Sequence, residues 1–344
     1  MILNLDNIVC FLVYFASTFR KNKMNSSLPY KTKQFFFVLI KLSIVVGAFY
    51  FIYQKLLNNP DLKFEDFLSF LDKNKLFSTK NIIFLVFLSS FNWFLEILKW
   101  RFLISKIKRI TFLEATEQSL GALTASIFTP NRIGEYGAKA IYFAKTHRKK
   151  VLLLTLISNM LQMSVTVIFG SIGLFFLYSN FDIDISYRIL RGIAILAFIT
   201  LFGVIGIKQN RFKIKGFSLE KVLDYIKNLG VHYLGYGLLL SVLRYAVFSF
   251  QFYFILTLFG IQLNYIDAMI LITSMYLLAS IIPTISIFDV VIKGSVALYV
   301  FGLADINQLP ILSCILLMWL LNFALPSVFG SYYVLNFNVL KNHN

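Results

Sequence analysis

Charged residues are scarce in this chain, and acidic residues are the scarcest. Of 344 residues, 16 are Asp or Glu and 33 are Lys or Arg, which gives a formal net charge of +17 with 14% of the residues charged. Soluble domains are usually about a quarter charged. Because 58% of this chain is hydrophobic, its composition excludes an ordinary soluble domain.

Cysteine and histidine are also rare. Cys10 and Cys314 lie far apart in apolar sequence, so neither a disulfide framework nor a redox pair is indicated. The three histidines are scattered and give no metal-ligand spacing. A Ser/His/Asp grouping, an HExxH motif, a P-loop and a Gly-rich dinucleotide turn are missing as well. We therefore expect no catalytic residues, no metal and no cofactor, and we do not expect an enzyme.

Long apolar runs are what the chain has in abundance. Six of them are long enough to cross a bilayer as helices, and they lie at 35–57, 81–104, 151–178, 188–207, 232–259 and 310–338. We predict an all-α polytopic membrane protein with about six transmembrane helices. Residues 35–338 form a single membrane domain in this interpretation, between an N-terminal arm (1–34) and a C-terminal tail (339–344).

The first 23 residues are unlike a signal peptide, because their basic residues follow the apolar stretch instead of preceding it. They are either an interfacial segment or an extension from an upstream start site. Further on, Lys and Arg cluster at 21–33, 99–109, 145–150 and 208–227, whereas 179–187 and 302–308 carry acids and neither Lys nor Arg. This pattern is an orientation signal, not a sign of nucleic-acid binding. It places both chain ends in the cytoplasm, although the four lysines of 58–80 then lie outside.

Two apolar segments do not fit as simple spans. Residues 112–146 are broken near Pro130, and residues 265–303 are broken near Pro283. Each begins and ends on the same side of the membrane by the charge argument, so we predict two re-entrant helical hairpins, each dipping in and returning. The alternative is that each is a pair of short ordinary spans, giving eight or more spans in all.

The two broken segments resemble one another in sequence. Glu114-Ala115 precedes Pro130 as Asp267-Ala268 precedes Pro283, and the tripeptide Ala-Ser-Ile recurs at 125–127 and 279–281. After each proline an acid lies four residues before a lysine, the favourable order for an ion pair on a helix. We predict a duplication near 81–146 and 232–303, with low-complexity coincidence as the alternative. The two copies are inverted in the membrane under this topology, as in many secondary transporters.

The stretch "FTPNRIGEYGAKA" (128–140) places charges where a membrane span would exclude them. An unpaired charge at the bilayer centre costs roughly 2.5–3.5 kcal/mol, so these side chains should face a polar cavity or one another. With Asn131 as the N-cap, the following helix would point its positive end into the cavity, and an arginine suits a phosphate. Alternatively, the charges merely cap a span at the membrane boundary. The predicted substrate-binding residues are Pro130, Asn131, Arg132, Gly134, Glu135, Lys139, Arg244, Pro283, Asp289 and Lys293.

Other polar residues inside the spans have simpler interpretations. Glu96 is expected to form an interfacial ion pair with Lys99 or Arg101, with a proton relay as the alternative. Arg244 is a candidate charge partner for the second half. Gln251 is comparably deep, and Asn322 is expected to make hydrogen bonds between helices.

The motif "PNRIGEYGAKAIYF" (130–143) resembles the Pro-x-Arg-x-Gly-Glu motif, followed by a basic residue, of the lysylphosphatidylglycerol synthase transmembrane family, also called the flippase-like domain. The preceding "KWRFLI" (99–104) and the Pro283 segment are similar in order and spacing, so the resemblance covers nearly all of the chain after about residue 35. The second motif departs from the family, because "PTISIFDVVIK" (283–293) lacks the usual Gly-Gly and carries Asp289.

The resemblance implies a membrane domain that moves or presents lipids in a bacterial cytoplasmic membrane. We expect a stand-alone member without the soluble synthase domain, acting as a translocase for a lipid or a lipid-linked intermediate with an anionic headgroup. The alternative is a non-catalytic accessory subunit that scaffolds a membrane-bound glycosyltransferase or lipid-modifying enzyme. A homo-oligomer is compatible with either.

Overall fold

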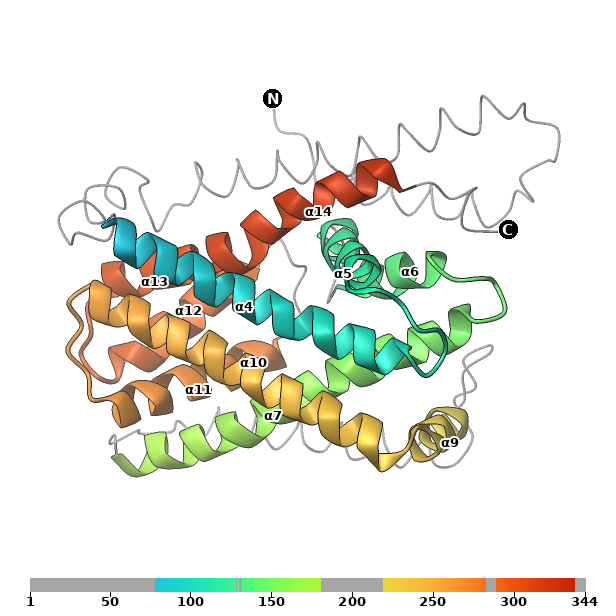
Figure 1. Ribbon diagram of the computed structural model, residues 1–344. Helices are drawn as coiled ribbons and strands as arrows, with labels where there is room; N and C mark the ends of the chain where they lie inside the picture. Colours follow the sequence, from blue (N-terminus) through green and yellow to red (C-terminus); the bar gives the residue numbers. More distant parts are fainter. Residues whose placement is uncertain (1–77, 128, 130–131, 181–218, 283–288, 338–344) are drawn as a thin grey trace, which may run out of the picture. The chain divides into compact units, whose positions relative to one another are not determined.

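The fold was analysed in a computed structural model, which describes residues 78–127, 129, 132–180, 219–282 and 289–337. All of these residues belong to one compact unit, Val45–Asn344. Every regular element among them is a helix (Figure 1). The predicted all-α class is confirmed for this part of the chain.

Four long apolar helices in the described part of the chain could cross a membrane. They are α4 (Thr79–Ile104), α7 (Arg148–Asn180), α10 (Val231–Leu258) and a continuous helix made of α13 (Gln308–Trp319), the π-helix η1 (Leu320–Ala324) and α14 (Leu325–Asn336). They match four of the six predicted spans, so the chain is a multi-pass membrane protein. The other two predictions, 35–57 and 188–207, lie outside the described residues, as do 1–34 and 339–344.

The two segments predicted to be broken are indeed interrupted. The first contains α5 (Phe112–Ser126) and α6 (Ile133–Ile141), and the second contains α11 (Tyr265–Ile281) and α12 (Asp289–Gly302). In each case the two helices contact one another. The interruptions coincide with Pro130 and Pro283, which are themselves outside the described residues. A further short amphipathic helix, α9 (Leu219–Leu229), precedes α10.

The start of α5 shows how the local sequence fixes these boundaries. The Thr111 side chain accepts a hydrogen bond from the backbone N–H of Glu114 at 3.2 Å, and the backbone N–H of Thr111 donates to the Glu114 carboxylate at 2.6 Å. This reciprocal pair is a capping box, which satisfies two N–H groups that a helix start would otherwise leave without partners. The helix therefore begins directly after the loop that follows α4.

Contacts between helices occur in matched pairs. The contacts α4–α5, α5–α6 and α6–α7 have counterparts in α10–α11, α11–α12 and α12–α13, and α4 packs directly on α10. Each broken segment also packs its first helix on the long helix that ends the other half: α5 packs on α14, and α11 packs on α7. These pairings follow if α4 to α7 correspond in order to α10, α11, α12 and the last long helix.

Two glycines, one in each half, show the same correspondence at the level of single residues. Gly330 of α14 lies so close to α5 that an added Cβ would collide with the carbonyl oxygen of Leu120. Gly170 of α7 crosses α11 in the same way, and its added Cβ would lie 3.0 Å from the carbonyl oxygen of Thr273. Leu120 and Thr273 are separated by the same interval as Pro130 and Pro283. The relationship between the halves therefore extends beyond the two broken segments into α7 and α14.

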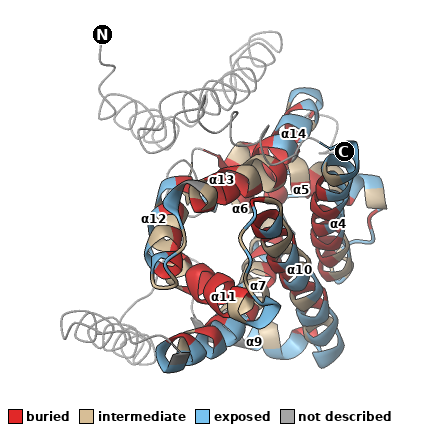
Figure 2. Cartoon of the chain, turned by 90° about the vertical axis from the view of Figure 1, so that its left-hand side faces the viewer, coloured by how far each residue is buried: buried red, intermediate tan, exposed pale blue. Residues whose placement is uncertain are grey.

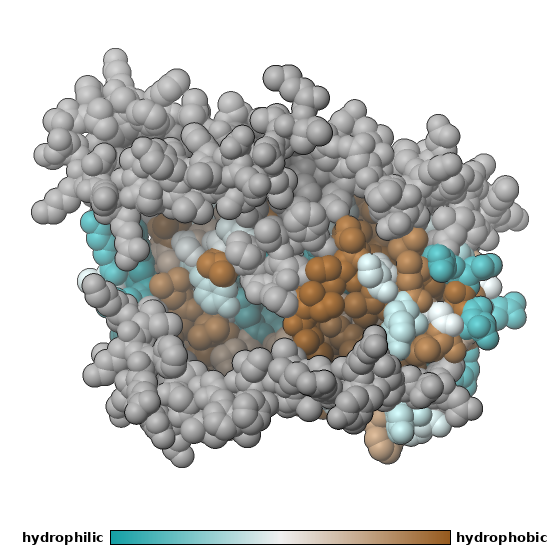
Figure 3. Space-filling model, turned by 180° about the vertical axis from the view of Figure 1, so that it is seen from behind, coloured by the Kyte–Doolittle hydropathy of each residue, from teal (hydrophilic) through white to brown (hydrophobic). Residues whose placement is uncertain are grey.

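Buried apolar side chains of the described residues gather in two clusters. The larger involves mainly α10 to α13 around Phe252 and Phe301, and the smaller joins α4 to α7 around Trp100. Figure 2 shows the burial along each helix, with most of α11 buried. Many large apolar side chains lie instead on the outside, and hydrophobic residues cover much of the described surface seen in Figure 3. An exposed apolar exterior is expected of helices surrounded by lipid.

Candidate functional site

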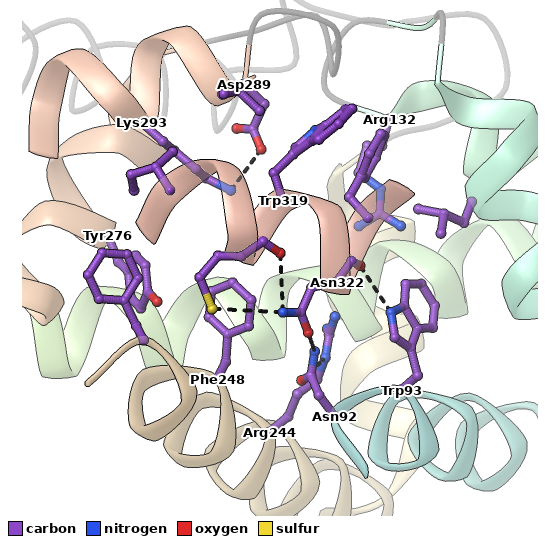
Figure 4. Close-up of a pocket in the computed structure, with 16 residues that line it drawn as sticks. Asn92, Trp93, Arg132, Arg244, Phe248, Tyr276, Asp289, Lys293, Trp319 and Asn322 are labelled. Carbon is purple, nitrogen blue, oxygen red and sulfur yellow. Dashed lines mark hydrogen bonds and ion pairs between the residues drawn. The ribbon is translucent and has the colours of Figure 1, made fainter. Parts of the chain in front are cut away.

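A cavity of about 330 Å³ lies where the two related sets of helices meet (Figure 4). Four of the predicted substrate-binding residues line it: Arg132, Arg244, Asp289 and Lys293. They come from the start of α6, from α10 and from α12. Side chains that are more than 100 residues apart in sequence are thus collected around one space.

Arg132 has an unusual backbone conformation at the start of α6. It is the N-cap residue of that helix, with a left-handed φ of 57°. The predicted N-cap was Asn131, and this was wrong by one residue because the chain makes its left-handed turn at Arg132. The Arg132 side chain is 38% exposed and its Nη2 lies 3.3 Å from Glu135. Its Nε is buried and has no hydrogen-bond partner among the described residues, so the guanidinium retains donor capacity at the cavity.

Gly134, Glu135 and Lys139 are not among the described residues that line the cavity, whereas Pro130 and Asn131 lie outside the described residues. Glu135 and Lys139 form a buried ion pair at 2.8 Å, with side-chain exposures of 5% and 1%. The Lys139 ammonium lies 4.2 Å from the centre of the Trp100 ring, a cation–π contact. The backbone N–H of Gly134 donates to the Thr129 hydroxyl at 2.8 Å, which ties the start of α6 to the preceding turn. In this arrangement these residues hold Arg132 in place.

Arg244 belongs to a second buried network, which joins the two halves. Its Nη1 lies 2.7 Å from the Glu96 carboxylate, and its Nε donates to the Asn92 side chain at 3.1 Å. Glu96 also pairs with Lys99 at 2.8 Å, as the sequence predicted. The sequence makes Arg244 a candidate charge partner for the second half, and the acid that it contacts in the structure is Glu96 of α4 in the first half. No local pattern could reveal a pair 148 residues apart.

The second broken segment contributes the predicted pair of Asp289 and Lys293. The Lys293 ammonium lies 2.7 Å from the Asp289 carboxylate, and their side chains are 37% and 32% exposed, respectively. This pair is equivalent in sequence to Glu135 and Lys139. It lines the cavity and is partly exposed, whereas the Glu135–Lys139 pair is buried.

Amide side chains close another part of the cavity, around the π-helix η1. The Asn322 amide donates to Gln251 at 2.8 Å and accepts from the Asn92 amide at 3.0 Å. The indole N–H of Trp93 donates to the backbone carbonyl oxygen of Asn322 at 3.0 Å. The predicted role of Asn322 in hydrogen bonding between helices is confirmed. A π-helical turn inside a longer α-helix frequently marks a functional position.

Two further polar groups in the cavity wall were not anticipated from the sequence. The Tyr276 hydroxyl and the Trp319 indole N–H are buried and have no hydrogen-bond partner among the described residues. Both side chains line the cavity (Figure 4). Since a buried donor without a partner is costly, these groups favour a ligand that can accept hydrogen bonds. Aromatic residues inside apolar runs give no sequence signal for such a role.

The charges around the cavity are unequal. Three cationic side chains line it, those of Arg132, Arg244 and Lys293, against one acid, Asp289. Arg244 is bound to Glu96, but Glu96 is itself shared with Lys99. The described residues contain no group of three or more His, Cys, Asp or Glu side chains that could hold a metal ion. The cavity is therefore suited to an anionic group with hydrogen-bond acceptors, which arginine binds well.

A family model covers most of the chain, including both broken segments. The model of the lysylphosphatidylglycerol synthase TM region matches residues 38–330. No curated protein and no solved structure matches the chain. The match agrees with the resemblance seen in the Pro-x-Arg-x-Gly-Glu motif, and it spans every described helix up to the first half of α14. The chain belongs to the family of the lysylphosphatidylglycerol synthase TM region.

Proposed function

We propose that this protein is a flippase-like translocase that moves a lipid or a lipid-linked intermediate across the membrane and binds its anionic headgroup in the central cavity. The observation that carries the proposal is the cavity of about 330 Å³ with Arg132, Arg244 and Lys293 in its wall. Membership of a membrane-lipid family supports a lipid as the molecule that brings the anion there. No chemical step is proposed, and the accessory-subunit role is the alternative against which the proposal is tested.

The lengths of the broken helices support a re-entrant arrangement. At about 1.5 Å per residue, the 17 residues of α11 extend about 25 Å, and α5, α6 and α12 are shorter. A hydrocarbon core is about 30 Å thick, so none of these helices is long enough to cross it alone. We propose that α5–α6 and α11–α12 enter from opposite sides and that their breaks meet at the cavity, as in transporters built from inverted repeats.

The proposal includes a location and an orientation, with the protein in a bacterial cytoplasmic membrane and both chain ends on the cytoplasmic side. The clusters of Lys and Arg support this orientation. In that orientation the first hairpin opens toward the cytoplasm and the second toward the exterior. A lipid headgroup could then be released on either side of one shared site.

Reconstitution into vesicles tests the proposal with Arg132. Asparagine tolerates a left-handed backbone, so Arg132→Asn removes the charge with little disturbance of the turn. Lys145→Asn removes an exposed charge outside the cavity and is the matched control. Vesicles would contain phosphatidylglycerol or phosphatidylcholine with a dithionite-sensitive fluorescent label on an acyl chain, which leaves the headgroup unchanged. Transport would be followed as the loss of fluorescence when labelled lipid reaches the leaflet that dithionite can reach.

We expect the wild-type protein and the Lys145→Asn variant to move labelled phosphatidylglycerol faster than labelled phosphatidylcholine. Arg132→Asn should slow the phosphatidylglycerol transport at least about tenfold, because a phosphate contact is lost. Arg132→Lys should retain part of it. An unchanged rate in Arg132→Asn would remove the assigned headgroup site. No transport by the normal protein, together with tight co-purification of a lipid-modifying enzyme, would favour the accessory role.

A further inference from the structure

An apolar groove of about 500 Å³ runs between α4, α5 and the η1–α14 part of the last helix. Its walls are mostly aromatic and aliphatic, and they include Phe87, Phe91, Phe94, Phe112, Leu325 and Phe329. A volume of a few hundred Å³ is typical of sites for small ligands. The charged side chains of the central cavity are not among the residues that line this groove.

We propose that the groove holds a hydrocarbon chain of the same lipid whose headgroup occupies the central cavity. This inference rests on the proposed function and specifies its substrate class: an amphipathic lipid whose anionic headgroup and apolar chain bind at adjoining sites. The occupant is then neither a separate partner nor a second copy of this chain.

Trp93 is the observation that connects the two spaces. It lines both the central cavity and the apolar groove. Its indole N–H donates to the carbonyl oxygen of Asn322 in η1 at 3.0 Å, which holds the ring at the seam between α4 and the last helix. Ser89, one helical turn before Trp93, bonds to the neighbouring carbonyl of Leu321 and strengthens the same seam. Trp93 is therefore shared by the walls of a cationic space and an apolar one.

The surface around the groove indicates what kind of molecule enters it. Phe87, Phe91 and Phe94 stack in succession along α4, with ring centres 6.1 Å apart in each step. Phe87 and Phe91 are exposed, as is Phe329 on the opposite wall. Because these helices form a membrane protein, an open apolar groove on their outer surface is accessible to lipid chains. A chain anchored there could continue sideways into the bilayer.

Photocrosslinking tests this placement in the full protein in vesicles. The probe is phosphatidylglycerol with a diazirine on one acyl chain, and the reference is phosphatidylcholine with the same chain. Labelled peptides are identified by mass spectrometry. Ser90→Phe fills the groove from an exposed position in its wall, and Ser164→Phe adds the same bulk to an exposed position on α7 as the matched control. The thermal unfolding midpoint of each variant checks that it is folded.

We expect phosphatidylglycerol to label residues 86–97 and 321–329 about tenfold more than phosphatidylcholine does, since the headgroup site selects the anionic lipid. Ser90→Phe should remove most of this labelling, and Ser164→Phe should leave it unchanged. Arg132→Asn should reduce phosphatidylglycerol labelling to the phosphatidylcholine level.

The outcomes separate this inference from the proposed function. Equal labelling by both lipids, or labelling that resists Ser90→Phe, would identify the groove as ordinary lipid-facing surface and overturn the inference, even where transport still depends on Arg132. With the photoreactive residue p-benzoylphenylalanine in place of Ser90, crosslinks to residues 1–77 of the same chain, or to a second copy, would also overturn it by showing another occupant. Transport that is indifferent to Arg132 would instead remove the proposed function.

Discussion

Arg132 is notable at the scale of single residues because its backbone is unfavourable for its side chain. A non-glycine residue in a sparsely populated backbone region costs about 1–3 kcal/mol and persists where surrounding contacts impose it. Here the turn is held by Thr129, which caps Gly134, and by the pairing of Glu135 with both Arg132 and Lys139. The cost is offset by contacts that hold the Arg132 guanidinium at the cavity wall.

Glu96 yields a stability prediction at the same scale. It is the shared acid of two cations, Lys99 and Arg244, and its side chain is buried. Removing one partner of a buried ion pair leaves charge without compensation and costs about 3–5 kcal/mol. We expect Glu96→Gln to lower the thermal unfolding midpoint in detergent strongly. Combining it with Lys99→Met should recover part of the loss, and a double variant as unstable as the single one would contradict the shared pairing.

The sequence anticipated some of these residues and not others, for a physical reason. Glu135–Lys139 and Asp289–Lys293 are four apart on a helix, so their pairing follows from helical geometry alone. Arg244–Glu96 joins two helices, and Trp93, Tyr276 and Trp319 acquire polar roles only through tertiary neighbours. A single sequence contains no periodicity that reports such contacts.

At the scale of helices, the close crossings of α5 with α14 and of α11 with α7 depend on glycine. An added methyl group at Gly330 would meet the backbone of α5, which cannot move out of the way as a flexible side chain could. Overpacking of this kind typically costs about 1–3 kcal/mol. We expect Gly330→Ala, and likewise Gly170→Ala, to lower the thermal unfolding midpoint.

Gly235 in α10 is the matched control for this prediction. A Cβ at that position would have no neighbour within 4 Å, so Gly235→Ala should be neutral or should raise the midpoint, since alanine favours helix by up to about 1 kcal/mol. Equal effects at Gly235 and Gly330 would show that helix propensity, and not the crossing, decides the outcome.

Helix breaks and spans were more predictable than helix partners. Proline positions marked both interruptions, and apolar length marked four of the long helices, because these are properties of contiguous residues. The π-helix η1 and the exchange of α5 onto α14 depend on packing between distant segments. The sequence repeat indicated which helices correspond, but not that each half packs its hairpin against the other half.

For the molecule as a whole, the two equivalent ion pairs differ in exposure. Glu135–Lys139 is buried, while Asp289–Lys293 is about one-third exposed and lines the cavity. Under the proposed function, this unequal exposure corresponds to a state in which only one half gives access to the shared cavity. The difference is open to chemical measurement.

Thiol labelling makes the measurement. In a background with Cys10→Ser and Cys314→Ser, a cysteine replaces either lysine and the paired acid is neutralised, giving Lys293→Cys/Asp289→Asn and Lys139→Cys/Glu135→Gln. Each double variant removes both members of a lysine–acid pair, so no buried lysine or carboxylate is left alone. Arg132 loses Glu135 as a partner in the second variant, but its side chain is 38% exposed. A water-soluble methanethiosulfonate reagent should modify the cysteine at 293 readily and the one at 139 roughly tenfold more slowly or not at all, because reactivity requires access.

Adding glycerol phosphate should protect position 293, whose side chain lines the proposed headgroup site. Equal rates at both positions would mean that the two halves have equal access to water, and the cavity would then not distinguish one side of the membrane from the other.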